Sequence, residues 1–210
     1  MDTGFLITAF VTMIVIIDPL GMTPIFVALT QGMGPARRRA VALRASIAAA
    51  LILAVFAAFG EAVLGFVGIS MPAFRIAGGM LLFLTALDML FERRTKRREG
   101  TAAQAEDEDD DDDDPSIFPI AIPLIAGPGS IASVILLTGQ RPGLEGLALV
   151  MGVTFTVLAL VLVLFLTAGI LERVLGRTGI NVITRLLGML LAALAVQFVL
   201  DGLKGVGLTG

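Results

Sequence analysis

The chain has 210 residues, of which 57% are hydrophobic and 16% are charged, and its formal net charge is −3. Soluble domains carry about 25% charged residues, so this composition, with a mean hydropathy of +0.96, indicates an integral protein of the lipid bilayer. The chain contains no cysteine and no histidine, which excludes disulfides, thiolate nucleophiles, Cys/His zinc sites and His-based catalytic triads. Half of its acidic residues lie in one run, 106–114, and nothing in the charge pattern indicates a nucleic-acid partner.

A membrane-spanning helix needs ~20 apolar residues, and six stretches fit that length. They are residues 5–30, 42–64, 73–91, 117–138, 146–171 and 184–203. The chain starts with Asp2 in place of a basic segment, and no small-residue cleavage site stands out. We therefore expect the first stretch to be a membrane span and not a removed signal peptide.

The first span is interrupted by residues 18–24, which read DPLGMTP. Pro19 and Pro24 lack the N–H that a continuous helix needs at those positions, and Gly21 adds a permissive backbone between them. Hydrocarbon offers no partner for a free backbone group, so such a break requires a protein cover or a polar cavity. Asp18 adds an ionisable group at the same depth, and an intramembrane carboxylate indicates a functional site. We interpret this stretch as the organising feature of the chain.

A polar linker separates the third span from the fourth. Basic residues 96–98 precede the acidic run, and because like charges in a block repel one another, the linker is predicted to be disordered. Of the 15 Lys and Arg residues, all but three flank the loops that follow spans one, three and five. Arg75, Arg141 and Lys204 lie on the opposite side. Basic residues concentrate in cytoplasmic loops, so both termini are expected to be extracytoplasmic.

The second half of the chain repeats features of the first half in the same order. Pro123 and Pro128 repeat the spacing of Pro19 and Pro24, again within a span. Further matches pair residues 61–65 with 172–176, 68–69 with 179–180, and 75–78 with 185–188. Each half contains three spans and therefore enters the membrane with opposite polarity. Inverted repeats with broken helices in equivalent positions are typical of transporters.

The sequence thus predicts an all-α membrane protein with six transmembrane helices, arranged as two inverted three-helix repeats with discontinuous helices 1 and 4. The repeats are residues 1–91 and 117–210, the disordered cytoplasmic linker is 92–116, and the whole forms one membrane domain. We expect the break in the first span to be covered by the break in the fourth, with the two related by a pseudo-two-fold axis.

Several of these segments resemble the MarC family of bacterial and archaeal inner-membrane proteins. Residues 18–26 resemble its first-span motif, residues 123–131 its fourth-span motif, and residues 75–90 and 185–203 its third and sixth spans. The resemblance implies a six-span, plasma-membrane transporter-like fold, distantly similar to the lysine-exporter superfamily, and transport of small neutral amino acids such as alanine and glycine. Asp18 stands where many members have Asn, and its carboxylate favours coupling to a proton or to a cation such as Na⁺.

The two breaks are also where we place the substrate. A helix that restarts presents free N–H groups and the positive end of its dipole, which suit a carboxylate, while carbonyls freed by the prolines suit an ammonium group or a cation. The candidate binding residues are Asp18, Pro19, Gly21, Thr23, Pro24, Pro123, Gly127, Pro128, Gly129, Ser130 and Gln197. No metal site and no cofactor are predicted.

Other interpretations of these residues stay open. Asp18 is also placed to cap the restarted helix, and Gln197 to hydrogen-bond between helices. An efflux permease for other small metabolites, a channel and a non-transporting scaffold are alternatives, and the oligomeric state is undetermined. An enzyme is not expected, because Ser130 has no histidine base to activate it and Asp18 is the only central intramembrane carboxylate, whereas an aspartyl protease needs two.

Overall fold

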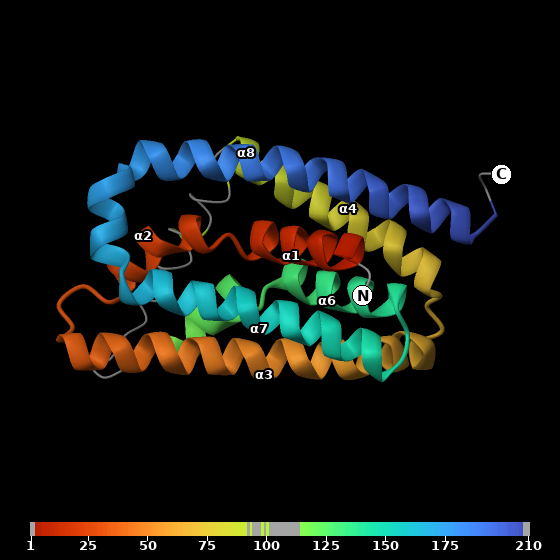
Figure 1. The fold of residues 1–210 in the computed structure, drawn as a ribbon, viewed down its shortest axis with the longest axis horizontal. Helices are drawn as coiled ribbons and strands as arrows, with labels where there is room; N and C mark the ends of the chain where they lie inside the picture. The colour runs from red at the N-terminus through yellow and green to blue at the C-terminus, as the bar shows by residue number, and fades with distance from the viewer. Residues whose placement is uncertain (1–2, 92, 94–97, 99, 101–113, 208–210) are drawn as a thin grey trace.

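The computed structural model of the chain describes residues 3–91, 93, 98, 100 and 114–207. Every regular element in this part of the chain is helical, as the sequence predicts (Figure 1). The elements are α1 (Thr3–Ile17), α2 (Pro19–Leu29), α3 (Pro35–Val67), α4 (Met71–Leu90), η1 (Ser116–Ile125), α6 (Pro128–Gln140), α7 (Leu144–Leu166) and α8 (Ala168–Gly205).

Five segments are long and apolar enough to cross a membrane, and a sixth is added if the bent pair η1 and α6 counts as one span. The five are Thr3–Leu29, Pro35–Val67, Met71–Leu90, Leu144–Leu166 and Thr178–Gly205. Together with the bent pair, they overlap all six stretches predicted from hydropathy. The last of them begins after Gly176, whose φ of 62° interrupts α8.

The connection between α3 and α4 follows from local sequence. Gly68 ends α3 with a φ of 83°, a left-handed conformation that costs glycine little. The hydroxyl of Ser70 then accepts a hydrogen bond from the N–H of Ala73 at 3.4 Å, and Pro72 occupies the first turn of α4, where its missing N–H is not needed. The short turn therefore returns the chain antiparallel to α3.

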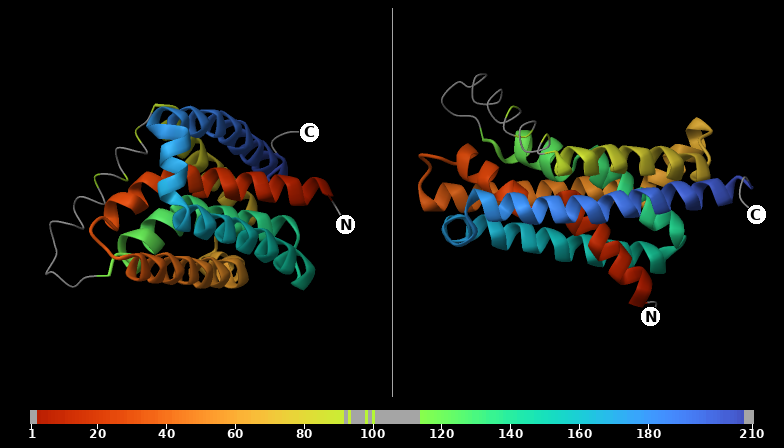
Figure 2. Two further views of the ribbon diagram at one scale, coloured as in Figure 1. Left: turned by 60° about the vertical axis from the view of Figure 1, so that its left-hand side comes forward. Right: turned by 90° about the horizontal axis from the view of Figure 1, so that it is seen from above.

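The helices run lengthwise in alternating directions, and both ends of the chain lie toward the same end of the bundle (Figures 1 and 2). α4 packs along α8, α3 along α7, and α1 against α6. Three helices of the first half of the chain therefore pack against helices of the second half, and α2 contacts α7 and α8. The central core lies between these pairs and includes the fully buried side chains of Met13, Phe26 and Leu136.

Glycines let α4 and α8 approach closely. A Cβ added to Gly79 would lie 2.8 Å from the carbonyl oxygen of Ala195, and one added to Gly188 would lie 2.9 Å from the Cβ of Met89. Such distances leave no space for a side chain, so these glycines serve helix packing, as small residues do at membrane helix interfaces.

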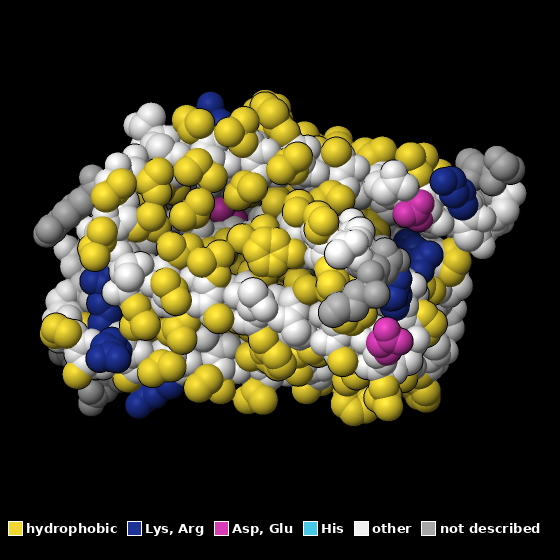
Figure 3. All heavy atoms as spheres, in the orientation of Figure 1, with side chains coloured by type: hydrophobic (Ala, Val, Ile, Leu, Met, Phe, Trp, Pro, Cys, Tyr) yellow, Lys and Arg dark blue, Asp and Glu magenta, His cyan; other side chains and the backbone are white. Residues whose placement is uncertain are grey.

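The outer surface is apolar over most of its length. Large hydrophobic side chains such as Leu51, Phe66 and Leu84 are exposed, and hydrophobic atoms cover most of the face drawn in Figure 3, with most Lys and Arg side chains near its two ends. Soluble monomers rarely expose continuous apolar surface of this extent. The bilayer is the solvent that this surface requires.

Candidate functional site

The break in the first span occupies a single residue. α1 ends at Ile17, and Asp18 adopts φ 57° and ψ 65°, a left-handed conformation that Asp and Asn tolerate better than most residues. Its Oδ1 accepts a hydrogen bond from the N–H of Gly21 at 3.1 Å, which caps α2. Pro19 takes the first position of α2, where a proline fits without loss. The capping interpretation of Asp18 is confirmed.

The second proline of this motif does not break the helix. Pro24 lies inside α2, and α1 and α2 together continue as one span of 27 residues. The hydroxyl of Thr23 donates to the carbonyl oxygen of Pro19 at 2.9 Å, so it is already engaged within its own helix. Gly21 and Thr23 are buried, and the loss of one backbone hydrogen bond at Pro24 is tolerated because protein covers most of this helix.

The cap on α2 leaves a carbonyl free one residue earlier. Because the N–H of Gly21 bonds to the Asp18 carboxylate, the carbonyl oxygen of Ile17 loses the donor that a continuous helix would supply. The guanidinium of Arg98 replaces it: Nη2 donates to the Ile17 oxygen at 3.1 Å, and Nη1 donates to Asp18 Oδ2 at 3.3 Å. Thr184 on α8 donates to Asp18 Oδ1 at 3.4 Å.

This ion pair is enclosed by protein. Asp18 is 1% exposed and Arg98 is 6% exposed. Burial lowers the pKa of the Arg98 guanidinium, against the opposing effect of the charge and hydrogen bond of Asp18, but an arginine stays cationic in proteins. A buried charge is stable only when it is paired and hydrogen-bonded, and this pair meets both conditions.

Sequence reasoning missed the role of Arg98. It lies in the linker for which disorder is predicted, and most of that linker (92, 94–97, 99 and 101–113) lies outside the described residues, so the disorder stays a prediction. Basic residues 96–98 form a run in which each residue fits the positive-inside pattern equally well. No signal in the sequence separates Arg98 from its neighbours.

The second break involves more residues than the first. Phe118 and Ile122 have extended backbone angles within η1, as expected for residues that precede a proline. η1 and α6 then meet at 55°. The hydroxyl of Ser130 donates to the carbonyl oxygen of Ile125 at 2.6 Å and accepts from the N–H of Gly127 at 3.0 Å. This hydroxyl therefore joins the two sides of the break.

The first turn of α6 carries backbone donors that no side chain of its cap residue can satisfy. Pro128 is the first residue of the helix, and the cap residue Gly127 has no side chain. The N–H groups of Gly129 and Ser130 precede the first donor that reaches back within the helix, the N–H of Ile131. Free N–H groups of this kind are the donors that the anion site predicted from the sequence requires.

A cavity of about 260 Å³ lies against this second break. Five predicted residues line it, namely Pro123, Gly127, Pro128, Gly129 and Ser130. The other lining residues are Ile16 of α1, Thr85 and Asp88 of α4, Arg98, and Leu124 of η1. The cavity thus brings together a guanidinium, a carboxylate and the uncapped first turn of α6.

The cavity also joins the two breaks. A Cβ on Gly129 would lie 2.8 Å from Cδ1 of Ile16, which is two residues before Asp18. Asp18 itself does not line the cavity but reaches it through Arg98. The first turn of α6 therefore packs against the last turn of α1.

Other predicted residues lie apart from the cavity. Pro19, Gly21, Thr23 and Pro24 belong to α2 and are not among its lining residues. Gln197 is exposed on α8, where its amide donates to Asp201 Oδ1 at 2.9 Å. In the part of the chain that the structure describes, no group of three or more acidic residues could hold a metal ion.

Comparisons with known proteins give one consistent result. The model of the family described as MarC family integral membrane protein matches residues 3–206. A UPF0056 membrane protein of Aquifex aeolicus is 39% identical over 94% of this chain and 92% of its own length. The UPF0056 inner membrane protein YhgN of Escherichia coli is 36% identical over 95% of this chain and 96% of its own. A UPF0056 membrane protein of Methanocaldococcus jannaschii is 38% identical over 98% of both chains. No solved structure matches.

Proposed function

Because this chain belongs to the MarC family of integral membrane proteins, we propose that it is a multi-pass transporter of small neutral amino acids of the alanine and glycine type. The names of its relatives state a membrane location and no substrate. One observation carries the proposal: the cavity at the junction of two interrupted helices is lined by Arg98, by Asp88 and by the uncapped first turn of α6.

These groups match the two charges of a zwitterion. The carboxylate of the substrate would accept hydrogen bonds from the first turn of α6 and from Arg98, since both present donors and positive potential. The ammonium group would bind near the Asp88 carboxylate on α4. A cavity of about 260 Å³ is small beside the ~300–1,000 Å³ of most ligand pockets, which favours a substrate with a short side chain.

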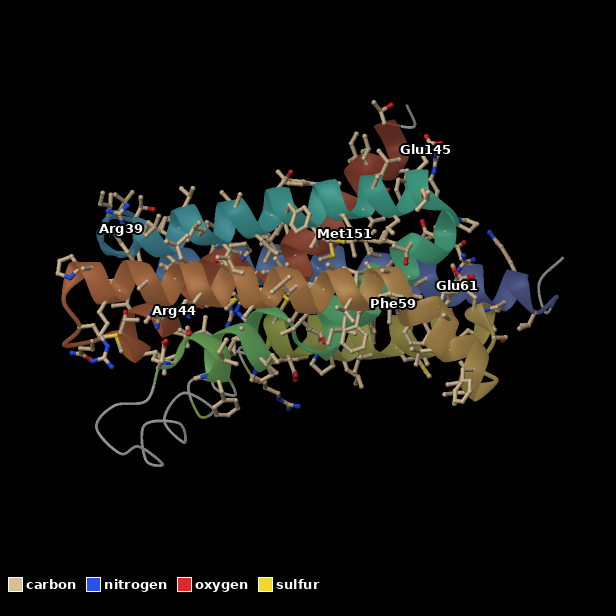
Figure 4. The ribbon with its side chains drawn as sticks, turned by 90° about the horizontal axis from the view of Figure 1, so that it is seen from below. Arg39, Arg44, Phe59, Glu61, Glu145 and Met151 are labelled. Carbon is tan, nitrogen blue, oxygen red and sulfur yellow. The ribbon has the colours of Figure 1, made fainter. Side chains whose placement is uncertain are left out.

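Packing between the halves supports the proposed inverted repeat. α4 packs along α8 and α3 along α7, and close glycine contacts run in both directions between α4 and α8, with Gly79 on Ala195 and Gly188 on Met89. Arg39 and Arg44 lie toward one end of the bundle, and Glu61 and Glu145 toward the other (Figure 4). We propose that the arginine-rich end faces the cytoplasm of a bacterial or archaeal cell, which leaves both termini outside.

Asp18 is the proposed coupling group. Its carboxylate is buried and is paired with Arg98, which lines the cavity. A proton or Na⁺ that bound to Asp18 would compete with the guanidinium. Release of Arg98 would then change both the charge and the space of the cavity. Occupancy of Asp18 would thereby be linked to occupancy of the substrate site.

Transport in proteoliposomes tests this proposal. Labelled alanine and glycine should enter by saturable counterflow, and Asp88→Asn should weaken it on the order of tenfold, since a hydrogen bond to a charged group contributes about 1.5–3 kcal/mol. Glu145→Gln, at the distant start of α7, is the control and should transport normally. Wild-type protein that neither binds nor transports a small neutral amino acid would contradict the proposal and favour another metabolite or a scaffold.

A further inference from the structure

A second pocket, of about 280 Å³, lies where α3 begins and α7 ends. One wall is cationic and consists of Arg38 and Arg39. The other wall is apolar and includes Met33, Phe165 and Leu166. Arg39 lies toward the same end of the bundle as Arg44 (Figure 4). The pocket shares no residue with the proposed transport cavity, so it needs a separate explanation.

Arg38 is held in place by stacked aromatic rings. Its guanidinium carbon lies 5.3 Å from the centroid of the Phe26 ring, and Phe26 stacks on Phe165 with ring centroids 4.2 Å apart and planes 3° apart. Both phenylalanines are 1% exposed. A cation over a buried aromatic face loses little further freedom on binding an anion, because the aromatic stack has already oriented it.

One donor of this arginine is unused. Nη2 of Arg38 is buried and makes no hydrogen bond to any residue that the structure describes. A buried donor without a partner is unfavourable, because it has lost its hydrogen bonds to water and gained none from protein. An anion in the pocket would satisfy this donor, and a planar guanidinium offers the paired donors that phosphate oxygens accept.

The start of α3 adds to the positive potential. Pro35, a lining residue, is the first residue of α3, and the cap residue Gly34 makes no side-chain hydrogen bond to the first turn. Free N–H groups and the helix dipole there favour an anion. No acidic side chain lines the pocket among the described residues. Two arginines therefore face no opposing charge within it.

We propose that this pocket binds the phosphate group of an anionic phospholipid. The arginines and the first turn of α3 hold the phosphate, and the apolar wall holds the glycerol and upper acyl region, because Leu166 is 45% exposed beside the buried Phe165. Free phosphate shares the anion chemistry but gains nothing from the apolar wall. Basic pockets between membrane helices at the cytoplasmic side suit such headgroups.

Native mass spectrometry of the detergent-solubilised protein tests the assignment. We would titrate wild type, Arg38→Gln, Arg38→Lys and Arg37→Gln with phosphatidylglycerol, with phosphatidylcholine and with inorganic phosphate. Arg37 is the matched control, because it precedes Arg38 and is exposed but does not line the pocket. Phosphatidylglycerol should bind wild type and Arg37→Gln alike, and Arg38→Gln on the order of tenfold more weakly. Arg38→Lys should fall between them, since it keeps the charge and loses the planar fork.

Three outcomes would overturn the proposal. If Arg37→Gln and Arg38→Gln weakened phosphatidylglycerol binding equally, the effect would come from general surface charge and not from the pocket. Equal binding of phosphatidylcholine would remove the requirement for an anionic lipid, and inorganic phosphate that competes as well as the lipid would leave an anion site without a lipid partner. Circular dichroism verifies that Arg38→Gln is folded, and because the chain contains no tryptophan and no tyrosine, the helical signal is the suitable measure.

Discussion

The Arg98 guanidinium lies 3.3 Å from the Asp18 carboxylate and 3.1 Å from the Ile17 carbonyl oxygen. One side chain from the linker thus satisfies both acceptors that the first helix break exposes. The arrangement explains how an acid and an open carbonyl persist inside an apolar bundle, where each alone would be costly.

Removal of either charge should destabilise the fold more than removal of both. Arg98→Gln leaves Asp18 buried without its counter-charge, which costs about 3–5 kcal/mol for a buried pair. The double variant Asp18→Asn, Arg98→Gln removes both charges and should recover at least half of that loss. Thermal unfolding, followed by helical circular dichroism, compares wild type, Asp18→Asn, Arg98→Gln and the double variant. If the stability losses of the two single variants added up to the loss of the double variant, the two residues would act independently.

The role of Asp18 in coupling can be separated from its role as a helix cap. Asp18→Asn keeps an oxygen that accepts from the N–H of Gly21, so α2 stays capped, but it removes the ionisable group. We expect this variant to retain alanine counterflow while uptake no longer responds to a pH or Na⁺ gradient. Asp18→Ala also loses the cap, at about 0.5–2 kcal/mol. If uptake by Asp18→Asn still responded to the pH or Na⁺ gradient, the coupling group would be a residue other than Asp18.

The breaks were predictable because proline and glycine act locally. Pro19, Pro123 and Pro128 remove backbone donors whatever surrounds them, and the apolar stretches between charged loops follow directly from hydropathy. Tertiary contacts decide the rest. Pro24 stays helical because protein covers it, and the selection of Arg98 from a basic run depends on a cavity that forms only when spans from both halves meet.

The ion pair between Arg44 of α3 and Asp114, just before η1, should make stability depend on acidity. Burial alone would raise the pKa of Asp114, but hydrogen bonds from Arg44 and Ser116 outweigh it, and the net pKa lies below the ordinary carboxyl value. A lowered folded pKa stabilises above the unfolded value of about 3.9, and the contribution is lost as the pH falls through the folded pKa.

Asp114→Asn should therefore be less stable than wild type near neutral pH, and the difference should shrink below about pH 4. Because the Arg44 side chain is 63% exposed and that of Asp114 is 35% exposed, solvent screens the pair and the difference is small. Unfolding midpoints across this pH range measure it, with Glu145→Gln as the comparison. A difference that is constant with pH would show that the carboxylate charge contributes nothing.

The second break should tolerate added volume poorly. A Cβ at Gly127 would lie 2.5 Å from the carbonyl oxygen of Pro123, and backbone cannot yield as a flexible side chain can. Gly127→Ala should therefore shift the start of α6, lower stability by about 1–3 kcal/mol and reduce alanine counterflow together with it. Gly152 of α7 is the matched control, because nothing lies within 4 Å of a Cβ there. Gly152→Ala should be neutral or more stable by up to about 1 kcal/mol, so equal losses in the two variants would show that the geometry of the break is not what limits the site.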